Sequence, residues 1–206
     1  MLPFDIPEGT TIEGLLTEIV PKAHASLVPA SAGREPFTCA FEVDGAASWI
    51  IDLSGPSMNV RAGDIRTPDA RLRTSAEHAR AFLDDWCGRS ATSVRRPSGD
   101  MILLSDPRLL KRLRMVTGAI TLTISDFPIA DMKRPVSLSI AVGAPAKKVE
   151  PGADVVIETT MRTYGRLLAG EMGPEDALAD GDVKISGKRL VAMQFALAIA
   201  PLFPRL

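Results

Sequence analysis

The chain has 206 residues, with 24 basic and 25 acidic side chains and a hydrophobic content of 46%. This length is enough for one large domain or two small ones with a substantial hydrophobic core. The charges nearly balance and no dense basic stripe is interleaved with aromatic residues, which argues against nucleic acid as a partner.

From the amino-terminal residues we expect a cytoplasmic protein. The amino terminus carries acidic residues and prolines where a secretory signal has a basic segment followed by an apolar run. The longest apolar stretch, Leu190 to Ala200, contains Gln194 and is shorter than the ~20 residues that a transmembrane helix needs. Cys39 and Cys87 are expected to be free thiols. We therefore expect no transmembrane segment and no disulfide.

Helical periodicity, strand alternation and turn residues predict the elements of the first half. Thr10 and Glu13 have the spacing of a capping box, and Pro21 is expected to end or bend the helix that follows. The remaining expected elements are strands over 37–43 and 49–53 joined by Asp44-Gly45, a strand over 70–74, a helix capped by Thr74 and Glu77, a strand over 101–104, and a helix from Pro107 to Val116.

The second half shows the same kinds of pattern. Alternating apolar residues predict strands over 120–124, 136–142, 154–159 and 183–186. Helices are expected from Met161 to a stop at Gly170, at Pro174, and over 188–200. Each half reads strand, strand, strand, helix, strand, helix, and the alternating patterns are those of antiparallel strands, so the fold class is expected to be α+β.

An internal repeat relates the two halves. Placing Asp69 on Asp154 shifts the chain by 85 positions and superposes a strand, a capping residue and an amphipathic helix. Gly99-Asp100 falls on Gly181-Asp182 at a shift of 82. We therefore predict two similar units, residues 1–118 and 119–206, related by an approximate twofold. Two unrelated halves that share a common order of elements remain the alternative.

The segment from Ala153 to Phe195 resembles the sterol carrier protein type two (SCP-2) family. The features that carry the resemblance are Asp154, Ala169-Gly170, Met172 with Pro174, Ala177, the spaced series Gly181, Val183, Ile185 and Gly187, and Ala192-Met193. The first half matches the opening of the family but diverges over Trp86 to Gly99, and the second half lacks the leading helix. The resemblance implies a tandem or pseudo-duplicated form of this domain.

The resemblance also implies a function. It implies a mainly antiparallel sheet covered on one face by helices, with an apolar tunnel that holds sterols, fatty acyl chains or other lipid-like molecules. We expect non-enzymatic binding, transfer or presentation of such a ligand. The residues expected to line the cavity lie on the inward phase of their elements: Leu138, Ile140, Ile157, Leu168, Met172, Leu178, Met193 and Leu197.

Two other functions stay open at this point. An isomerase or cyclase could use the same apolar pocket to orient a substrate. Alternatively, the protein could be an accessory subunit whose last helix, apolar almost all round, docks a partner. A transient membrane-surface or protein partner is also left open, because Arg108, Lys111, Arg112 and Arg114 form either a headgroup-binding face or a solvated helix face.

The residues that usually carry catalysis show no recognisable arrangement. His24 and His78 have no partners at metal-ligand spacing and are expected to be solvated. Cys39 falls inside an alternating strand and is expected to be a small buried residue. No nucleophile elbow or phosphate-binding loop is present in the sequence. We expect no catalytic residue, metal ligand or cofactor.

Overall fold

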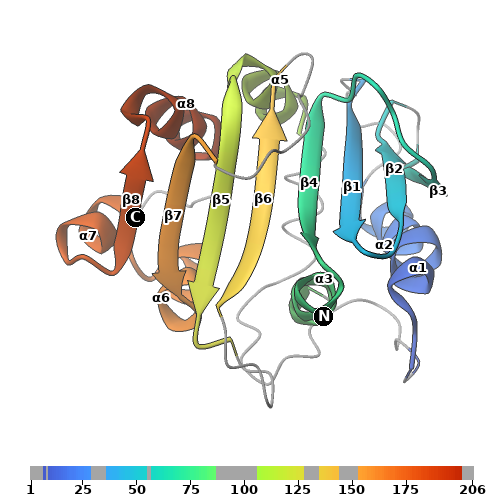
Figure 1. The fold of residues 1–206 in the computed structure, drawn as a ribbon, viewed down its shortest axis with the longest axis horizontal. Coiled ribbons are helices and arrows are strands. Elements are labelled where there is room, and N and C mark those ends of the chain that lie inside the picture. The colour runs from blue at the N-terminus through green and yellow to red at the C-terminus, as the bar shows by residue number, and fades with distance from the viewer. Residues whose placement is uncertain are drawn as a thin grey trace.

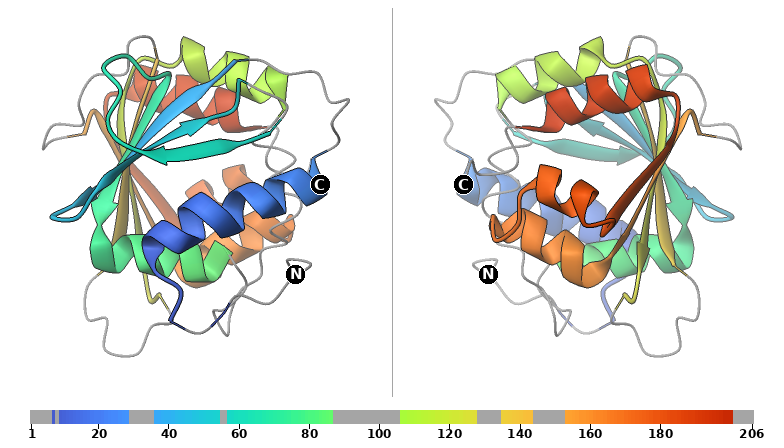
Figure 2. Two further views of the ribbon diagram at one scale, coloured as in Figure 1. Left: turned by 90° about the vertical axis from the view of Figure 1, so that its right-hand side faces the viewer. Right: turned by 90° about the vertical axis from the view of Figure 1, so that its left-hand side faces the viewer.

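One mixed sheet of eight strands forms the centre of the protein, and the helices lie on one of its faces (Figures 1 and 2). The computed structural model describes residues 7, 9–28, 36–54, 57–86, 106–127, 135–143 and 153–200. The strands follow the order β3-β2-β1-β4-β6-β5-β7-β8. The predicted α+β class is confirmed. The strand expected over 101–104 and the Gly99-Asp100 pair lie outside the described residues.

The first half supplies four strands and the helices that flank them. Its elements are α1 (Ile12–Gly14), a π-helical turn η1 (Leu15–Ile19), α2 (Val20–Leu27), β1 (Thr38–Asp44), β2 (Ser48–Asp52), β3 (Asn59–Ala62), β4 (Ala70–Ser75), α3 (Ala76–Trp86) and α5 (Pro107–Met115). The hairpin of β1 and β2 and the helix after Asp106 occur as predicted, whereas β3 had no clear signal in the sequence.

The opening helix differs from the prediction at its cap, and a π-helical turn directly precedes the helix segment that contains Pro21. The cap is Thr11, whose hydroxyl accepts a hydrogen bond from the Gly14 N–H at 3.0 Å, and not Thr10. Pro21 does not end the helix, which continues to Leu27. A proline removes one backbone donor and crowds the preceding turn, and the widened π turn over Leu15–Ile19 accommodates it.

The second half supplies the other four strands. Its elements are β5 (Gly118–Ser125), β6 (Val136–Val142), β7 (Val155–Thr160), α6 (Met161–Ala169), α7 (Pro174–Ala179), β8 (Val183–Gly187) and α8 (Arg189–Ile199). Gly170 ends α6 in the left-handed conformation with φ 71°, as its position predicted.

Asp69 and Asp154 make the same contact in the two halves. The carboxylate of Asp69 accepts a hydrogen bond from the Thr38 N–H at 2.8 Å. The carboxylate of Asp154 accepts one from the Ala119 N–H at 3.0 Å. In each half the aspartate precedes one strand and fastens the start of its parallel neighbour, β1 beside β4 and β5 beside β7. The shift of 85 positions therefore corresponds to equivalent geometry.

The helices α3 and α6, which follow β4 and β7, both begin at a side-chain hydroxyl cap. In α3 the cap lies one residue later than predicted. The Ser75 hydroxyl accepts from the His78 N–H at 3.2 Å, and the Thr160 hydroxyl accepts from the Thr163 N–H at 3.1 Å. Thr74, which was expected to cap α3, does not cap it.

Thr74 instead bonds across the sheet. Its hydroxyl donates to the Ser137 carbonyl of β6 at 2.7 Å. Thr159, 85 positions later, donates to the Asp182 carbonyl at the start of β8 at 3.1 Å. Beside β4, β6 therefore takes the place that β8 takes beside β7.

The two halves are related by a translation along the sheet, so the predicted twofold is wrong. β6 is antiparallel to both β4 and β5, and β5 therefore runs in the same direction as β4 and β1. The order β2-β1-β4 in the first half is repeated as β6-β5-β7 in the second half. A twofold within the sheet would have reversed the second set.

We expect the ion pair of Asp154 and Lys188, 2.6 Å between Oδ1 and Nζ, to contribute acid-sensitive stability. The hydrogen bond from Lys188 and that from the Ala119 N–H hold the pKa of Asp154 below its ordinary value of 3.8. A lowered native pKa stabilises the fold above the unfolded pKa, and this contribution is lost as the pH falls through the native value. Asp154→Asn should therefore lower the free energy of unfolding at pH 7 by less than about 1 kcal/mol, since the pair is partly solvated.

Urea unfolding of both proteins at pH 7 and pH 3 checks this prediction. The difference between them should shrink at pH 3, and a difference that stays the same at both pH values would contradict it.

Candidate functional site

The helices cover the two ends of the inner face of the sheet (Figure 2). At one end, α8 packs through Val191 on Ile120 and Val155, both completely buried. At the other end, Ile124 and Val136 are completely buried in a cluster with residues of α3 and α6. Both groups of helices thus bury aliphatic side chains near the strand ends.

Between these ends lies a band of half-buried aliphatic side chains. On β5, Leu122 is only partly buried although Ile120 and Ile124 on either side of it are inaccessible. The neighbouring strands repeat the pattern. We call the band the median row, and its members are Leu72, Leu122, Leu138, Ile140 and Ile157.

The median row is continuous across four strands. Leu122 lies opposite Leu138 on β6 and Ile157 on β7. Leu72 of β4 lies opposite Ile140 of β6, which joins the first half of the chain to the second. Side chains at these positions share one face of the sheet because successive residues alternate between faces. The row is therefore an apolar surface that the helices leave incompletely covered.

The seven predicted lining residues whose side chains the structure describes fall into three groups. Leu138, Ile140 and Ile157 belong to the median row. Met172 is buried in a small cluster with Leu167 and Ala177. The side chain of Leu168 lies outside the described residues. The remaining three are exposed: Leu178 by 45%, Met193 by 56% and Leu197 by 65%.

The inward orientation predicted for Met193 and Leu197 is therefore wrong. In α8 the positions that face the protein are Val191 and Ala198, which are buried, and Phe195, which is half-buried. The helix is apolar almost all round, so the sequence held no periodic signal that could fix its rotation. Leu178 lies on the six-residue α7, which is too short for helical periodicity to fix the face that packs on the core.

Leu72 and Leu122 are members of the median row that the sequence reasoning missed. Leu122 alternates with Ile120 and Ile124, and this alternation could have identified it. Leu72 could not be placed, because its position depends on the pairing of β4 with β6, which are far apart in the sequence.

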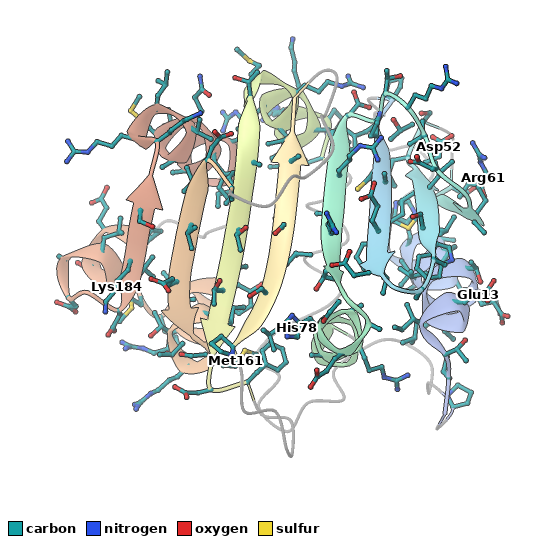
Figure 3. All side chains as sticks on the ribbon, viewed as in Figure 1. Glu13, Asp52, Arg61, His78, Met161 and Lys184 are labelled. Carbon is teal, nitrogen blue, oxygen red and sulfur yellow. The ribbon has the colours of Figure 1, made fainter. Side chains whose placement is uncertain are left out.

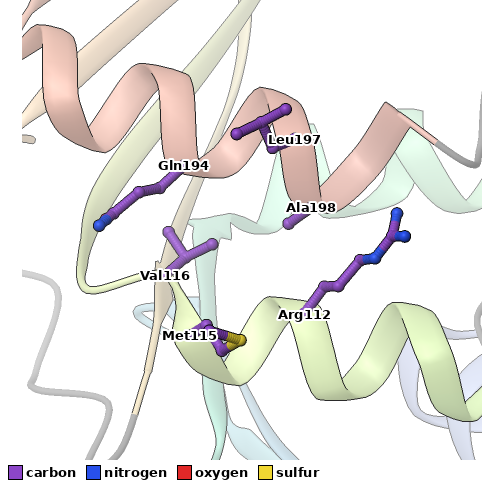
Figure 4. Close-up of a pocket in the computed structure, with 6 residues that line it drawn as sticks. All are labelled: Arg112, Met115, Val116, Gln194, Leu197 and Ala198. Carbon is purple, nitrogen blue, oxygen red and sulfur yellow. The ribbon is translucent and has the colours of Figure 1, made fainter.

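A hollow of about 190 Å³ lies between α5 and α8 (Figure 4). Its lining residues are Arg112, Met115, Val116, Gln194, Leu197 and Ala198. Pockets that enclose small-molecule ligands usually have about 300 to 1,000 Å³. The hollow alone is therefore too small for a sterol, but Val116 and Ala198 belong to the same packed cluster as Leu72 and Ile140 of the median row.

One cysteine and two histidines near the core are buried or hydrogen-bonded within the fold. Cys39 is buried as predicted, and desolvation raises the pKa of its thiol to about 12, so it is a poor nucleophile at neutral pH. Both histidines differ from the prediction: His24 is buried, and the Nδ1 of His78 accepts a hydrogen bond from the Ser137 N–H at 3.1 Å, so that α3 is tied to β6 (Figure 3).

The part of the chain that the structure describes holds neither a cluster of metal ligands nor a helix that could span a membrane. Among the described residues, no group of three or more His, Cys, Asp or Glu side chains is placed to hold a metal ion. The helices in the described ranges are too short or too polar to cross a bilayer.

Several solved structures resemble this chain. They include sterol carrier protein domain 2 of Helicoverpa armigera, 17% identical, with 48% of this chain and 76% of that chain covered and a TM-score of 0.34. Sterol carrier protein 2 like 2 of Aedes aegypti is 16% identical, with 43% and 91% covered and a TM-score of 0.31. Sterol carrier protein 2 of Yarrowia lipolytica in its apo form is 10% identical, with 64% and 93% covered and a TM-score of 0.34.

A search of curated protein sequences gave no match. Residues 100–199 match the model of the SCP-2 sterol transfer family, and this range contains the motif-bearing segment and most of the median row. Over residues 100–199 the chain is therefore similar to the SCP-2 sterol transfer family.

Proposed function

We propose that the protein binds and transfers a lipid-like ligand whose apolar part lies against the median row. The observation that carries this proposal is the burial pattern along the central strands. Ile120 and Ile124 are inaccessible, whereas Leu122 between them retains exposed surface. Leucine and isoleucine are among the residue types most often fully buried in folded proteins. An apolar band left open along the central strands is suited to a ligand that covers it.

The energetics favour such a ligand without any polar motif. Burial of ten methylene groups contributes about 8 kcal/mol, whereas a typical net hydrogen bond contributes about 1 kcal/mol. An apolar ligand can therefore be held by the aliphatic side chains of the row alone. Transfer or presentation, with no covalent step, is the function that such a site supports best.

We further propose that the chain is a tandem SCP-2-like form, with units near residues 1–118 and 119–206. The matching hydrogen bonds of Asp69 and Asp154, and the equivalent strand orders, support this proposal. The two units would share one ligand site, because Leu72 of the first unit lies opposite Ile140 of the second. We propose that this shared ligand site is a tunnel bounded by the sheet and by both groups of helices.

Leu122→Trp tests the proposed site. A ring added at this half-buried position should lower the affinity for a fluorescent fatty acid by about tenfold or more, since it displaces at least two methylenes of the ligand. The melting temperature should change little. The matched control is Ile120→Trp on the same strand and face, where overpacking of a completely buried position should cost about 1 to 3 kcal/mol.

Fluorescence titration and thermal unfolding of the wild type and both variants give the two readouts. A wild-type protein without saturable binding of fatty acid or sterol would contradict the proposed function. Equal destabilisation by the two substitutions would show that Leu122 is ordinary core and that the site lies elsewhere.

A further inference from the structure

The outward faces of α5 and α8 carry a cluster of exposed apolar side chains. Leu190, Met193 and Leu197 lie at helical spacing on α8 and are exposed by 62%, 56% and 65%. Met115 at the end of α5 is exposed by 72% and lines the same hollow as Leu197 (Figure 4). We call this combined area the α5–α8 surface. Large apolar residues gathered on one surface in this way usually mark an interaction site.

The same surface is basic. On α5, Arg108, Lys111 and Arg112 are exposed and share a helix face with Met115, and Arg189 is exposed at the start of α8. Neither helix contains an aspartate or glutamate. The whole chain has a formal net charge of −1, so the acidic residues that balance these cations lie elsewhere.

The exposed residues are not needed for the packing of their own helices. Leu109 and Leu110 anchor α5 in the core, and Val191 and Ala198 anchor α8. Both helices already have a buried face. The apolar residues of the opposite face are therefore available to a partner.

We propose that the α5–α8 surface docks on an anionic lipid bilayer. Exposed Leu and Met side chains beside Arg and Lys, with no acidic residue, match the interface of a bilayer, where apolar groups enter the headgroup region and cations meet lipid phosphates. A second copy of the chain fits less well, because a symmetric contact through this surface would place like charges against one another.

The α5–α8 surface lies near the proposed ligand site. The hollow in this surface adjoins the cluster that contains Leu72 and Ile140, so the docked face is close to one end of the median row. The docking proposal does not depend on the ligand: the surface is defined by exposed residues of α5 and α8, and the median row by residues of the sheet.

The test is sedimentation of the full chain with vesicles of phosphatidylcholine, alone or with one quarter phosphatidylserine. The wild type should bind the anionic vesicles, and 0.5 M NaCl should weaken that binding. Arg108→Ser with Arg112→Ser should lower the partition coefficient by about 25-fold, about fivefold for each charge. Leu190→Ser with Leu197→Ser should lower it by about tenfold or more, since two apolar side chains no longer enter the interface.

The charge-matched control is Arg61→Ser with Arg66→Ser, which removes two exposed cations at the β3 side of the sheet and should leave vesicle binding unchanged. Unchanged melting temperatures establish that the variants fold. Equal loss in the control, or wild-type binding that does not depend on phosphatidylserine, would overturn the proposal. A wild-type dimer that Leu197→Ser dissociates, with no vesicle binding, would assign the surface to self-association instead. Fatty acid titration without vesicles should give wild-type affinity for every variant, which separates this proposal from that of the ligand site.

Discussion

Gly143→Ala is expected to lower the free energy of unfolding by about 3 kcal/mol or more, because backbone strain and a steric clash coincide at this position. Gly143 has φ +99°, a conformation that residues with a side chain rarely adopt. A Cβ at this position would lie 2.2 Å from the carbonyl oxygen of Val116, a backbone atom that cannot move aside without shifting the start of β5. Urea unfolding followed by circular dichroism measures the change.

The position also explains why the effect should spread. The Gly143 N–H donates to the Asp69 carbonyl at 3.2 Å. This bond lies at the end of β6, the strand that pairs with β5 on one side and β4 on the other and so joins the two halves. Gly181→Ala is the matched control: its φ of +76° is similarly unusual, but no atom lies within 4 Å of the added Cβ. We expect the control to cost about 1 kcal/mol. Similar losses for the two variants would show that the close approach to Val116 contributes nothing.

Arg71→Met should destabilise the fold by about 3 to 5 kcal/mol, since it removes one partner of a buried ion pair. Arg71 is only 3% exposed. Because it neighbours Leu72 on β4, its side chain points away from the median row. The sheet face on that side is covered by no described helix (Figure 2). The Arg71 guanidinium contacts Glu42 and Asp64, the latter at 3.2 Å, and donates to the Ile65 carbonyl. Methionine fills a similar volume but leaves the largely buried Glu42 carboxylate without its cation.

Arg73→Met provides the comparison for this ion pair. Arg73 pairs with Asp44 at 2.7 Å but is 39% exposed, so its loss should cost less than about 1 kcal/mol. Folded Arg71→Met should still bind fatty acid normally, because the median row lies on the other face. A stability loss below 1 kcal/mol for Arg71→Met would show that Glu42 is well solvated and that the pair is ordinary surface charge.

Local signals in the sequence were sufficient for most of the elements. Alternation identified β5 and β6, the caps at Asp106 and Gly170 fixed helix ends, and the shift from Asp69 to Asp154 identified positions that make equivalent contacts. These features depend on neighbours in the chain, or on a comparison of the chain with itself. Short-range patterns therefore predicted the fold class and a pair of aspartates that make equivalent contacts.

Features that depend on contacts between distant segments were not predictable. The pairing of β4 with β6 creates the single sheet, the translational relation and the place of Leu72, and no residue of β4 indicates its partner. The rotation of α8 depends on what it packs against, because apolar residues occupy nearly its whole circumference. Met193 and Leu197 were placed inward for this reason although they are exposed.

The translational relation has a consequence for self-association. Units related by a twofold form a closed pair, whereas units related by a translation can in principle be added without limit. A sheet edge that pairs with a strand of the next unit could therefore also pair with a strand of another chain. On β4 that edge is occupied by β6, and the equivalent edge of β7 is occupied by β8. β8 is short and mostly exposed, and it carries Lys184, a residue type that discourages further strand pairing. We therefore expect β8 to discourage extension of the sheet by a strand of another chain.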